Sequence, residues 1–205
     1  MSDLFTFPPL VSTYLLDPRV QNAVDDLTKS TMAKGFDTQF SWNEFPGYVA
    51  TWLAAQHVVA EWCTAQFELW DASWGHELGG APDYANRIES DDLLSAGGVY
   101  ECWQEGWVSR HVNVNDRPIG LAVECDVDVG EVKISIEFSE ELTPSLRREL
   151  ESFGWSLDRA SDAYTLASLP IKIERAKEGY ATLDVAKLLD YASAALSVLR
   201  SNPHV

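Results

Sequence analysis

The chain has 205 residues, of which 46% are hydrophobic and eight are tryptophan, and its formal net charge at pH 7 is −17. A chain of this length can bury a large core without disulfide bonds. Its negative field repels phosphate backbones and anionic lipid and attracts basic surfaces within about 8 Å at physiological salt, which argues against nucleic acid and membranes as direct partners.

The cysteines indicate a reducing compartment. Cys63, Cys102 and Cys125 are widely spaced, with no CxxC pair and no cysteine–histidine cluster of the kind that binds zinc. No basic segment followed by an apolar stretch opens the chain, and no apolar run reaches the roughly 18 residues of a membrane span. We therefore expect free thiols in a cytoplasmic protein that carries neither a metal nor a cofactor.

Residues 1–97 are predicted to form an N-terminal helical region that is rich in tryptophan. Residues 1–17 show no helix or strand pattern and are expected to be irregular. A helix is then expected from Asp17 to Lys34, because the aspartate suits the cap position and Pro18 suits the first turn. Gly35 follows this segment and is expected to end the helix.

The strongest helical pattern runs from Asn43 to Trp74, with Asn43 as its cap and Gly75 as its stop. Apolar residues cover more than half of the circumference, which is typical of a helix that is buried on two sides. An exposed aromatic face reserved for a partner is the alternative. The polar, glycine-rich residues 79–98 then predict a loop that contains the boundary between the two regions of the chain.

Residues 98–205 predict an α+β module. Short runs that favour strands occupy Val99–Trp103 and Trp107–Val114. Apolar and polar side chains then alternate along Ile119–Val127 and Val132–Phe138, as in a hairpin with one buried face and one wet face. We expect a mainly antiparallel sheet of about five strands backed by helices, with the helical region added at the N-terminus.

A capped helix is expected directly after the hairpin. Thr143 suits its cap, Pro144 its first helical position and Gly154 its C-terminal end, and Trp155 should pack beneath it. The residues expected on its buried face are Leu146, Leu150 and Phe153.

The end of the chain is predicted to add strands and a closing helix. One or two strands are expected in Ala163–Ile173, with Pro170 near an edge or a turn, because proline cannot donate to a central ladder. The closing helix is expected from about Thr182 to Arg200, where leucine and alanine recur at helical spacing.

Three segments of the second region carry a resemblance to a known family. They are the hairpin Val123–Phe138, the segment Leu146–Trp155 with its Phe-Gly-Trp end, and the closing helix that ends in Leu196–Arg200. Their order over residues 98–205 resembles the type III secretion chaperone-like superfamily, including YbjN-type proteins and TY-Chap modules. The resemblance implies a non-enzymatic module that binds other proteins, often as a dimer. The segment Asn43–Trp74 has no counterpart in that family.

His57 and Glu61 are one candidate for chemistry. They are four residues apart on the long predicted helix, so both side chains can face one metal ion or act as a base and its orienting carboxylate. His76 and Glu77 complete such a site only if the chain folds back beyond the helix. The alternative is a solvated pair on the less apolar side of the helix.

Two further candidates lie in the predicted strands. His111 is a potential partner for the thiol of Cys102 or Cys125, but a thiolate nucleophile needs a base within about 3 Å, and apolar alternation already explains Cys125. A set of carboxylates also lies at strand spacing and across the following turn, which permits calcium or simply a solvated strand face. These carboxylates belong to Glu124, Asp126, Asp128 and Glu131.

Aromatic and acidic residues gather in one glycine-bounded segment, and we predict that they form the contact surface for a partner. They are Tyr100, Glu101, Trp103, Glu105 and Trp107. Aromatic residues are enriched in binding hot spots, and neighbouring carboxylates favour a partner that is basic and partly apolar. The alternative is that at least one of the tryptophans belongs to the core.

We expect a cytoplasmic protein-binding module, a chaperone-like adaptor or an inhibitor of a basic partner, with no catalytic residues and with homodimer formation left open. A first alternative is an anti-restriction type of inhibitor that mimics nucleic acid, which a regular array of exposed carboxylates would favour. A second alternative is a small enzyme with a His/Glu site. A concave pocket that holds His57 or His111 beside a second titratable group would favour this enzyme.

Overall fold

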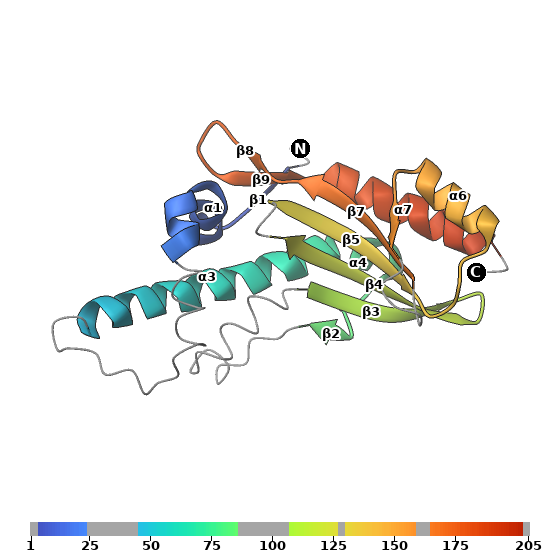
Figure 1. Ribbon diagram of the computed structural model, residues 1–205, viewed down its shortest axis with the longest axis horizontal. Coiled ribbons are helices and arrows are strands. Elements are labelled where there is room, and N and C mark those ends of the chain that lie inside the picture. The colour runs from blue at the N-terminus through green and yellow to red at the C-terminus, as the bar shows by residue number, and fades with distance from the viewer. Residues whose placement is uncertain (1–3, 24–44, 86–106, 127–129, 159–164, 203–205) are drawn as a thin grey trace.

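The computed structural model describes residues 4–23, 45–85, 107–126, 130–158 and 165–202 (Figure 1). Residues 18–23 are helical. The other elements are β1 (Leu4–Thr6), α1 (Pro9–Leu16), α3 (Phe45–Asp71), α4 (Trp74–Leu78), β2 (Tyr84–Ala85), β3 (Trp107–Val114), β4 (Arg117–Asp126), β5 (Glu131–Phe138), α6 (Pro144–Ser152), β6 (Ser156–Asp158), β7 (Thr165–Lys172), β8 (Glu174–Arg175), β9 (Ala181–Asp184) and α7 (Val185–Ser201).

The described strands form two antiparallel sheets. The larger has six strands in the order β2-β3-β4-β5-β7-β6, and the smaller has three in the order β1-β9-β8. Because β2 has only two residues, the larger sheet consists mainly of the other strands. The predicted fold class is confirmed: a mainly antiparallel sheet is backed by helices, and the N-terminal region is helical.

The large sheet has one face in the core. Along β4 and β5 the residues of this inner face are all buried, and they belong to the same core as the buried residues of α3, α6 and α7. They are Ile119, Leu121, Val123, Cys125, Val132, Ile134, Ile136 and Phe138. The predicted hairpin is therefore confirmed, with Val123 paired to Ile134 and Leu121 paired to Ile136.

Three tryptophans anchor α3 and the short helix α4 in that core. Trp62, Trp70 and Trp74 are fully buried, which confirms the core interpretation for these residues. Trp62 stacks on Phe7 at 6.4 Å between ring centroids. From α4, Trp74 Nε1 donates a hydrogen bond to the Ala122 carbonyl of β4 at 3.0 Å. The helix α3 itself packs against α1 and against the strands β3 and β4, so it is buried on two sides, as its apolar circumference predicts.

The expectation of an irregular N-terminus is wrong. Residues 4–6 form β1, which pairs with β9, and α1 buries Val11 and Tyr14. Ser12 Oγ donates to the Phe7 carbonyl at 2.9 Å and accepts from the Ala181 backbone N–H at 3.1 Å. Tertiary contacts with the end of the chain stabilise these short elements, and a short segment carries too little periodicity to reveal them.

The two helix boundaries predicted before the sheet have different outcomes. Asp17 caps the helical residues 18–23, since its Oδ1 accepts from the Arg19 backbone N–H at 3.0 Å; the predicted continuation to Lys34 lies outside the described residues. The second boundary is wrong, because Gly75 lies inside α4 rather than after the helix. A Cβ on Gly75 would lie 3.0 Å from the Trp70 carbonyl oxygen, so the glycine is required by close packing.

The capped helix after the hairpin is confirmed with one exception. Thr143 Oγ1 accepts from the Leu146 backbone N–H at 3.3 Å, Gly154 adopts a φ of +88°, and Trp155 is buried against Trp74. Phe153, expected on the buried face, is 47% exposed. It occupies the C-cap, where the backbone leaves the helix and the helical spacing no longer applies.

The last part of the chain contains strands that the pattern did not predict. β6, β8 and β9 have four residues or fewer, too short for a clear alternation. The closing helix begins at Val185 rather than Thr182, because Ala181–Asp184 pairs with β1 and Asp184 then accepts from the Lys187 backbone N–H at 3.2 Å. β6 pairs only with residues 166–168 of β7. Pro170 lies beyond them, where β7 has no paired neighbour on that side among the described residues, so it occupies a local edge as predicted.

None of the described helices has the length and hydropathy that would let it cross a membrane. The predicted boundary between residues 97 and 98 lies outside the described residues.

Candidate functional site

The predicted partner-contact surface lies largely outside the described residues. This applies to Tyr100, Glu101, Trp103 and Glu105. For Trp107 only the backbone is described, at the start of β3, where it pairs with β4. The contact role of these five residues therefore stays a prediction.

The helix pair His57 and Glu61 is not assembled into a site. His57 is exposed, and Glu61 Oε2 accepts a hydrogen bond from the Leu10 backbone N–H at 3.1 Å. The carboxylate thus joins α3 to the start of α1. Nowhere in the described part of the chain do three His, Cys, Asp or Glu side chains come together as a metal site would require.

His76 and Glu77 serve a different contact. Glu77 Oε1 accepts from Ser193 Oγ at 2.7 Å and lies 3.8 Å from His76 Nδ1. The carboxylate thereby links α4 to α7, while the His76 side chain is exposed. The pair does not extend the His57 position into a larger cluster.

The described thiols are buried and are unsuited to nucleophilic chemistry. Cys63 and Cys125 are both buried, and neither forms a disulfide bond. Desolvation raises the pKa of Cys125 far above its ordinary value, and the nearby Glu124 and Cys63 raise it further. His111 cannot serve Cys125 as a base, because the two side chains lie on opposite faces of the sheet. Cys102 lies outside the described residues.

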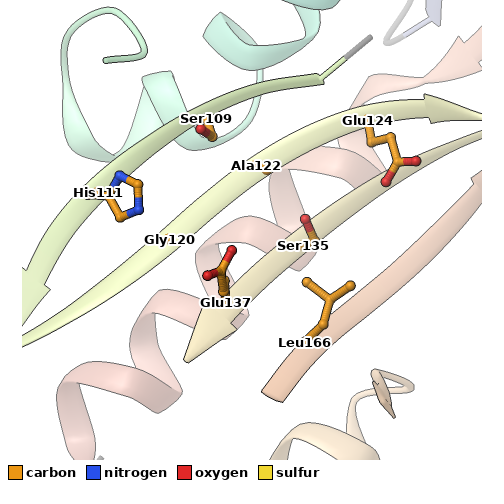
Figure 2. Close-up of a pocket in the computed structure, with 8 residues that line it drawn as sticks. All are labelled: Ser109, His111, Gly120, Ala122, Glu124, Ser135, Glu137 and Leu166. Atoms are coloured by element: carbon orange, nitrogen blue, oxygen red, sulfur yellow. The ribbon is translucent and has the colours of Figure 1, made fainter. Parts of the chain in front are cut away.

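A hollow of about 380 Å³ lies on the outer face of the large sheet, the face opposite the core. Figure 2 shows its side chains in front of the strands, with the helices behind. The lining comes from four neighbouring strands: Ser109, His111, Gly120, Ala122, Glu124, Ser135, Glu137 and Leu166. Small residues in the centre of β4 and β5 account for the depression.

Strand pairing arranges these residues in rows across the sheet. Ser109 pairs with Ala122, which pairs with Ser135. In the next row Gly120 lies between His111 and Glu137. Since paired residues in adjacent strands project from the same face, all of these side chains meet over β4.

Gly120 leaves a slot between an imidazole and a carboxylate. A Cβ at this position would lie 3.2 Å from Glu137 Cβ, 3.8 Å from Glu137 Oε2 and 3.8 Å from His111 Nε2. Both polar groups therefore border the same small space above the strand, one on each side (Figure 2). Any larger residue at position 120 would occupy that space.

Ser109 supplies a polar group to the floor of the hollow. The residue is only 4% exposed, and its Oγ finds no hydrogen-bond partner in the structure as described. A buried hydroxyl without a partner costs about 1–3 kcal/mol, so it favours a ligand that can donate to it or accept from it.

The hollow also carries two exposed carboxylates, Glu124 and Glu137, and neither forms an ion pair with any described residue. Lys133 is the cross-strand partner of Glu124 and projects from the same face, whereas Glu137 is paired with the uncharged Gly120 and Leu166. Of the proposed calcium ligands, only Glu124 lines the hollow; Asp128 and the side chain of Asp126 lie outside the described residues. The site thus suits a cationic group from outside.

Sequence reasoning named His111 and Glu124 separately and missed Ser109, Gly120 and Glu137. The pairing register of the two hairpins, β3–β4 and β4–β5, is the information that places these residues side by side. Once β3, β4 and β5 are paired through their turns, His111 and Glu137 both fall beside the only glycine inside β4.

No family model, curated protein or solved structure matches this chain, so its resemblance to the type III secretion chaperone-like superfamily stays a prediction.

Proposed function

We propose that this chain is a protein-binding module that holds a basic segment of a partner in the hollow on the outer face of the large sheet. The observation that carries the proposal is the position of Glu137 in the hollow, where its partners in the adjacent strands are Gly120 and Leu166, neither of them charged. Glu124 lies in the same hollow, beside its cross-strand partner Lys133. An adaptor of chaperone-like type and an inhibitor of a basic partner are both consistent with this binding mode.

The size and charge of the hollow support this function. About 380 Å³ is at the lower end of the range for ligand pockets and accommodates one or two side chains of a partner. The net charge of −17 adds a long-range attraction that speeds the encounter with a basic protein. Short-range selectivity then comes from the glutamates, the imidazole and the buried hydroxyl.

Affinity capture from a native lysate at low and high salt tests this function. The bait is the unmodified chain, the double variant Glu124→Gln/Glu137→Gln, or the control Glu151→Gln/Glu178→Gln. The control removes the same charge at exposed positions outside the hollow. We expect basic proteins that bind at low salt, dissociate as salt rises, and are lost with the first variant only.

Two results would contradict the proposal. Equal loss with both double variants would show that the total charge, rather than the hollow, attracts basic proteins. Capture that neither variant changes would place the partner surface elsewhere on the chain, and the aromatic segment around Trp107 would then be the next candidate.

A small enzyme with a His/Glu site is a second candidate, because the hollow holds His111 beside Glu137. Such a pair can act as a general acid and a general base. A catalytic base is normally oriented by a hydrogen bond, and no described residue forms one with the His111 side chain. Turnover of a panel of chromogenic esters and phosphoesters that is lost in His111→Asn would support the enzyme; no turnover would exclude hydrolysis of these substrates.

A further inference from the structure

We propose that the cationic group bound in the hollow is an arginine guanidinium of the partner, seated over Gly120 between His111 and Glu137. This inference rests on the proposed binding of a basic partner, and it adds the chemical identity of the group that is recognised. It also assigns Gly120 a role in specificity, because the absence of a side chain there creates the space.

The shape of the slot favours a flat group. His111 Nε2 and Glu137 Oε2 each lie 3.8 Å from the point where a Cβ on Gly120 would be. A planar guanidinium can enter between them with its N–H edge directed at the Glu137 carboxylate and at the nitrogen on the edge of the imidazole. The bare backbone of Gly120 lets the group approach the strand closely.

The polar atoms around the slot are suited to several donors in one plane. A guanidinium has five N–H groups in a fixed fork, and a carboxylate such as that of Glu137 can accept two of them in parallel. Ser109 Oγ, one row away in the same hollow, is buried and without a described partner, so it is an acceptor for a further donor. A lysine ammonium is a compact, strongly hydrated charge, and it lacks the planar fork that binds a carboxylate through two parallel N–H groups.

Glu124 has a different role from Glu137. The two residues lie in rows on opposite sides of the Ser109–Ala122–Ser135 row. Glu124 therefore attracts the positive charge of the bound segment at the far end of the hollow, and it does not distinguish arginine from lysine. Glu137 borders the slot and contributes to both attraction and discrimination.

The test is an NMR titration of the full chain, uniformly labelled with nitrogen-15, with three blocked tripeptides. They have the form acetyl-Gly-X-Gly-amide, where X is arginine, lysine or citrulline, the neutral isostere of arginine. We expect the arginine peptide to shift the backbone amides of His111, Gly120 and Glu137. The lysine peptide should bind about tenfold more weakly or worse, and citrulline should show no saturable binding.

Variants separate the contributions of space and charge. Gly120→Val fills the slot but leaves both glutamates, and we expect it to abolish the preference for arginine. Glu137→Gln preserves the shape, and it should also abolish the preference; Glu124→Gln should weaken both cationic peptides by the same factor. Glu178→Gln, outside the hollow, is the control and should change nothing. Amide spectra of each free variant verify that the sheet is intact. If Gly120→Val fails to fold, Glu137→Gln still tests whether the slot causes the preference for arginine.

Equal affinity for the arginine and lysine peptides would overturn the inference, as would shifts confined to residues away from the slot or the absence of any saturable shift. These failures differ from failure of the proposed function. If lysate capture still depends on Glu124 and Glu137 while the peptides show no arginine preference, the chain binds a basic partner without a guanidinium slot. If neither experiment detects binding at the hollow, both proposals are wrong.

Discussion

The two faces of β4 and β5 differ sharply although their residues alternate along the same strands. The inner face presents Leu121, Val123 and Ile136, all fully buried. The outer face presents Gly120 and Glu137 in the hollow. Large branched side chains thus fill one side, while small and charged ones leave space on the other.

The difference shows that one strand register determines both the core and the hollow. Successive side chains along a strand point to opposite faces, so a slip by one residue would exchange the two sets completely. Packing of the apolar set therefore fixes the position of the slot above Gly120. Stability resides on the inner face, and the outer face is free to provide recognition.

Truncation of the same side chain on each face should produce the largest contrast. Leu121→Ala removes a fully buried side chain and should lower the free energy of unfolding by about 3 kcal/mol, through lost burial and the cavity that remains. Leu166→Ala removes a half-buried side chain at the rim of the hollow and should cost about 1 kcal/mol. Urea denaturation measures both, and equal losses would contradict the assignment of stability to the inner face.

The second contrast concerns two buried indoles on the core side of the sheet. Trp74 Nε1 donates to the Ala122 carbonyl at 3.0 Å, whereas Trp155 Nε1 has no hydrogen-bond partner within the described residues. Replacing either by phenylalanine leaves a similar void. Trp74→Phe also leaves a carbonyl without its donor, so it should cost about 1–2 kcal/mol more than Trp155→Phe.

Urea denaturation of the two phenylalanine variants provides this comparison as well. A larger loss for Trp155→Phe would show that the link between Trp74 and β4 adds little, and that packing alone holds α4 against the sheet.

The sequence predicted the inner face much better than the outer one. Alternation along residues 119–138 is a local signal that predicts the hairpin and its buried face, and the local pair Thr143 and Pro144 predicts the capped helix that follows. Most of what it missed depends on contacts between distant parts of the chain: β1 forms because β9 is available to pair with it, and Gly75 is set by its approach to Trp70.

The hollow was missed for a related reason. Gly120 and Glu137 belong to no chemical motif in the sequence, and the only specific partner that the sequence suggests for His111 is a thiol. Only the pairing of β3, β4 and β5 brings them together, and the register of two turns must be known before their proximity can be inferred.

The next prediction concerns the pH dependence of stability, which the buried thiol of Cys125 on the inner face of β4 should change. Burial raises the pKa of the Cys125 thiol far above its ordinary value of 9.0, so the folded chain keeps this proton in alkaline solution. The unfolded chain releases it, so unfolding is favoured progressively as the pH rises above 9. The thiol should lower the free energy of unfolding by about 1.4 kcal/mol for each pH unit above 9.

The difference between the unmodified chain and Cys125→Ala isolates this dependence from other alkaline titrations. Urea denaturation between pH 8 and pH 10, about one unit either side of the ordinary thiol value, should give a steeper decline for the unmodified chain. Parallel curves would mean that the Cys125 thiol ionises in the folded state and that the inner face at this position admits water.

The smallest effect on stability is expected where the effect on binding is largest. Glu124→Gln/Glu137→Gln retains the shape of both exposed side chains and reduces the repulsion within a chain of net charge −17. The variant also removes the attraction between Glu124 and its cross-strand neighbour Lys133, so the free energy of unfolding should change by less than about 0.5 kcal/mol. Urea denaturation and the capture experiment on the same protein sample test this separation together. A marked loss of stability would show that the glutamates take part in folding, and lost capture could then no longer be attributed to the hollow.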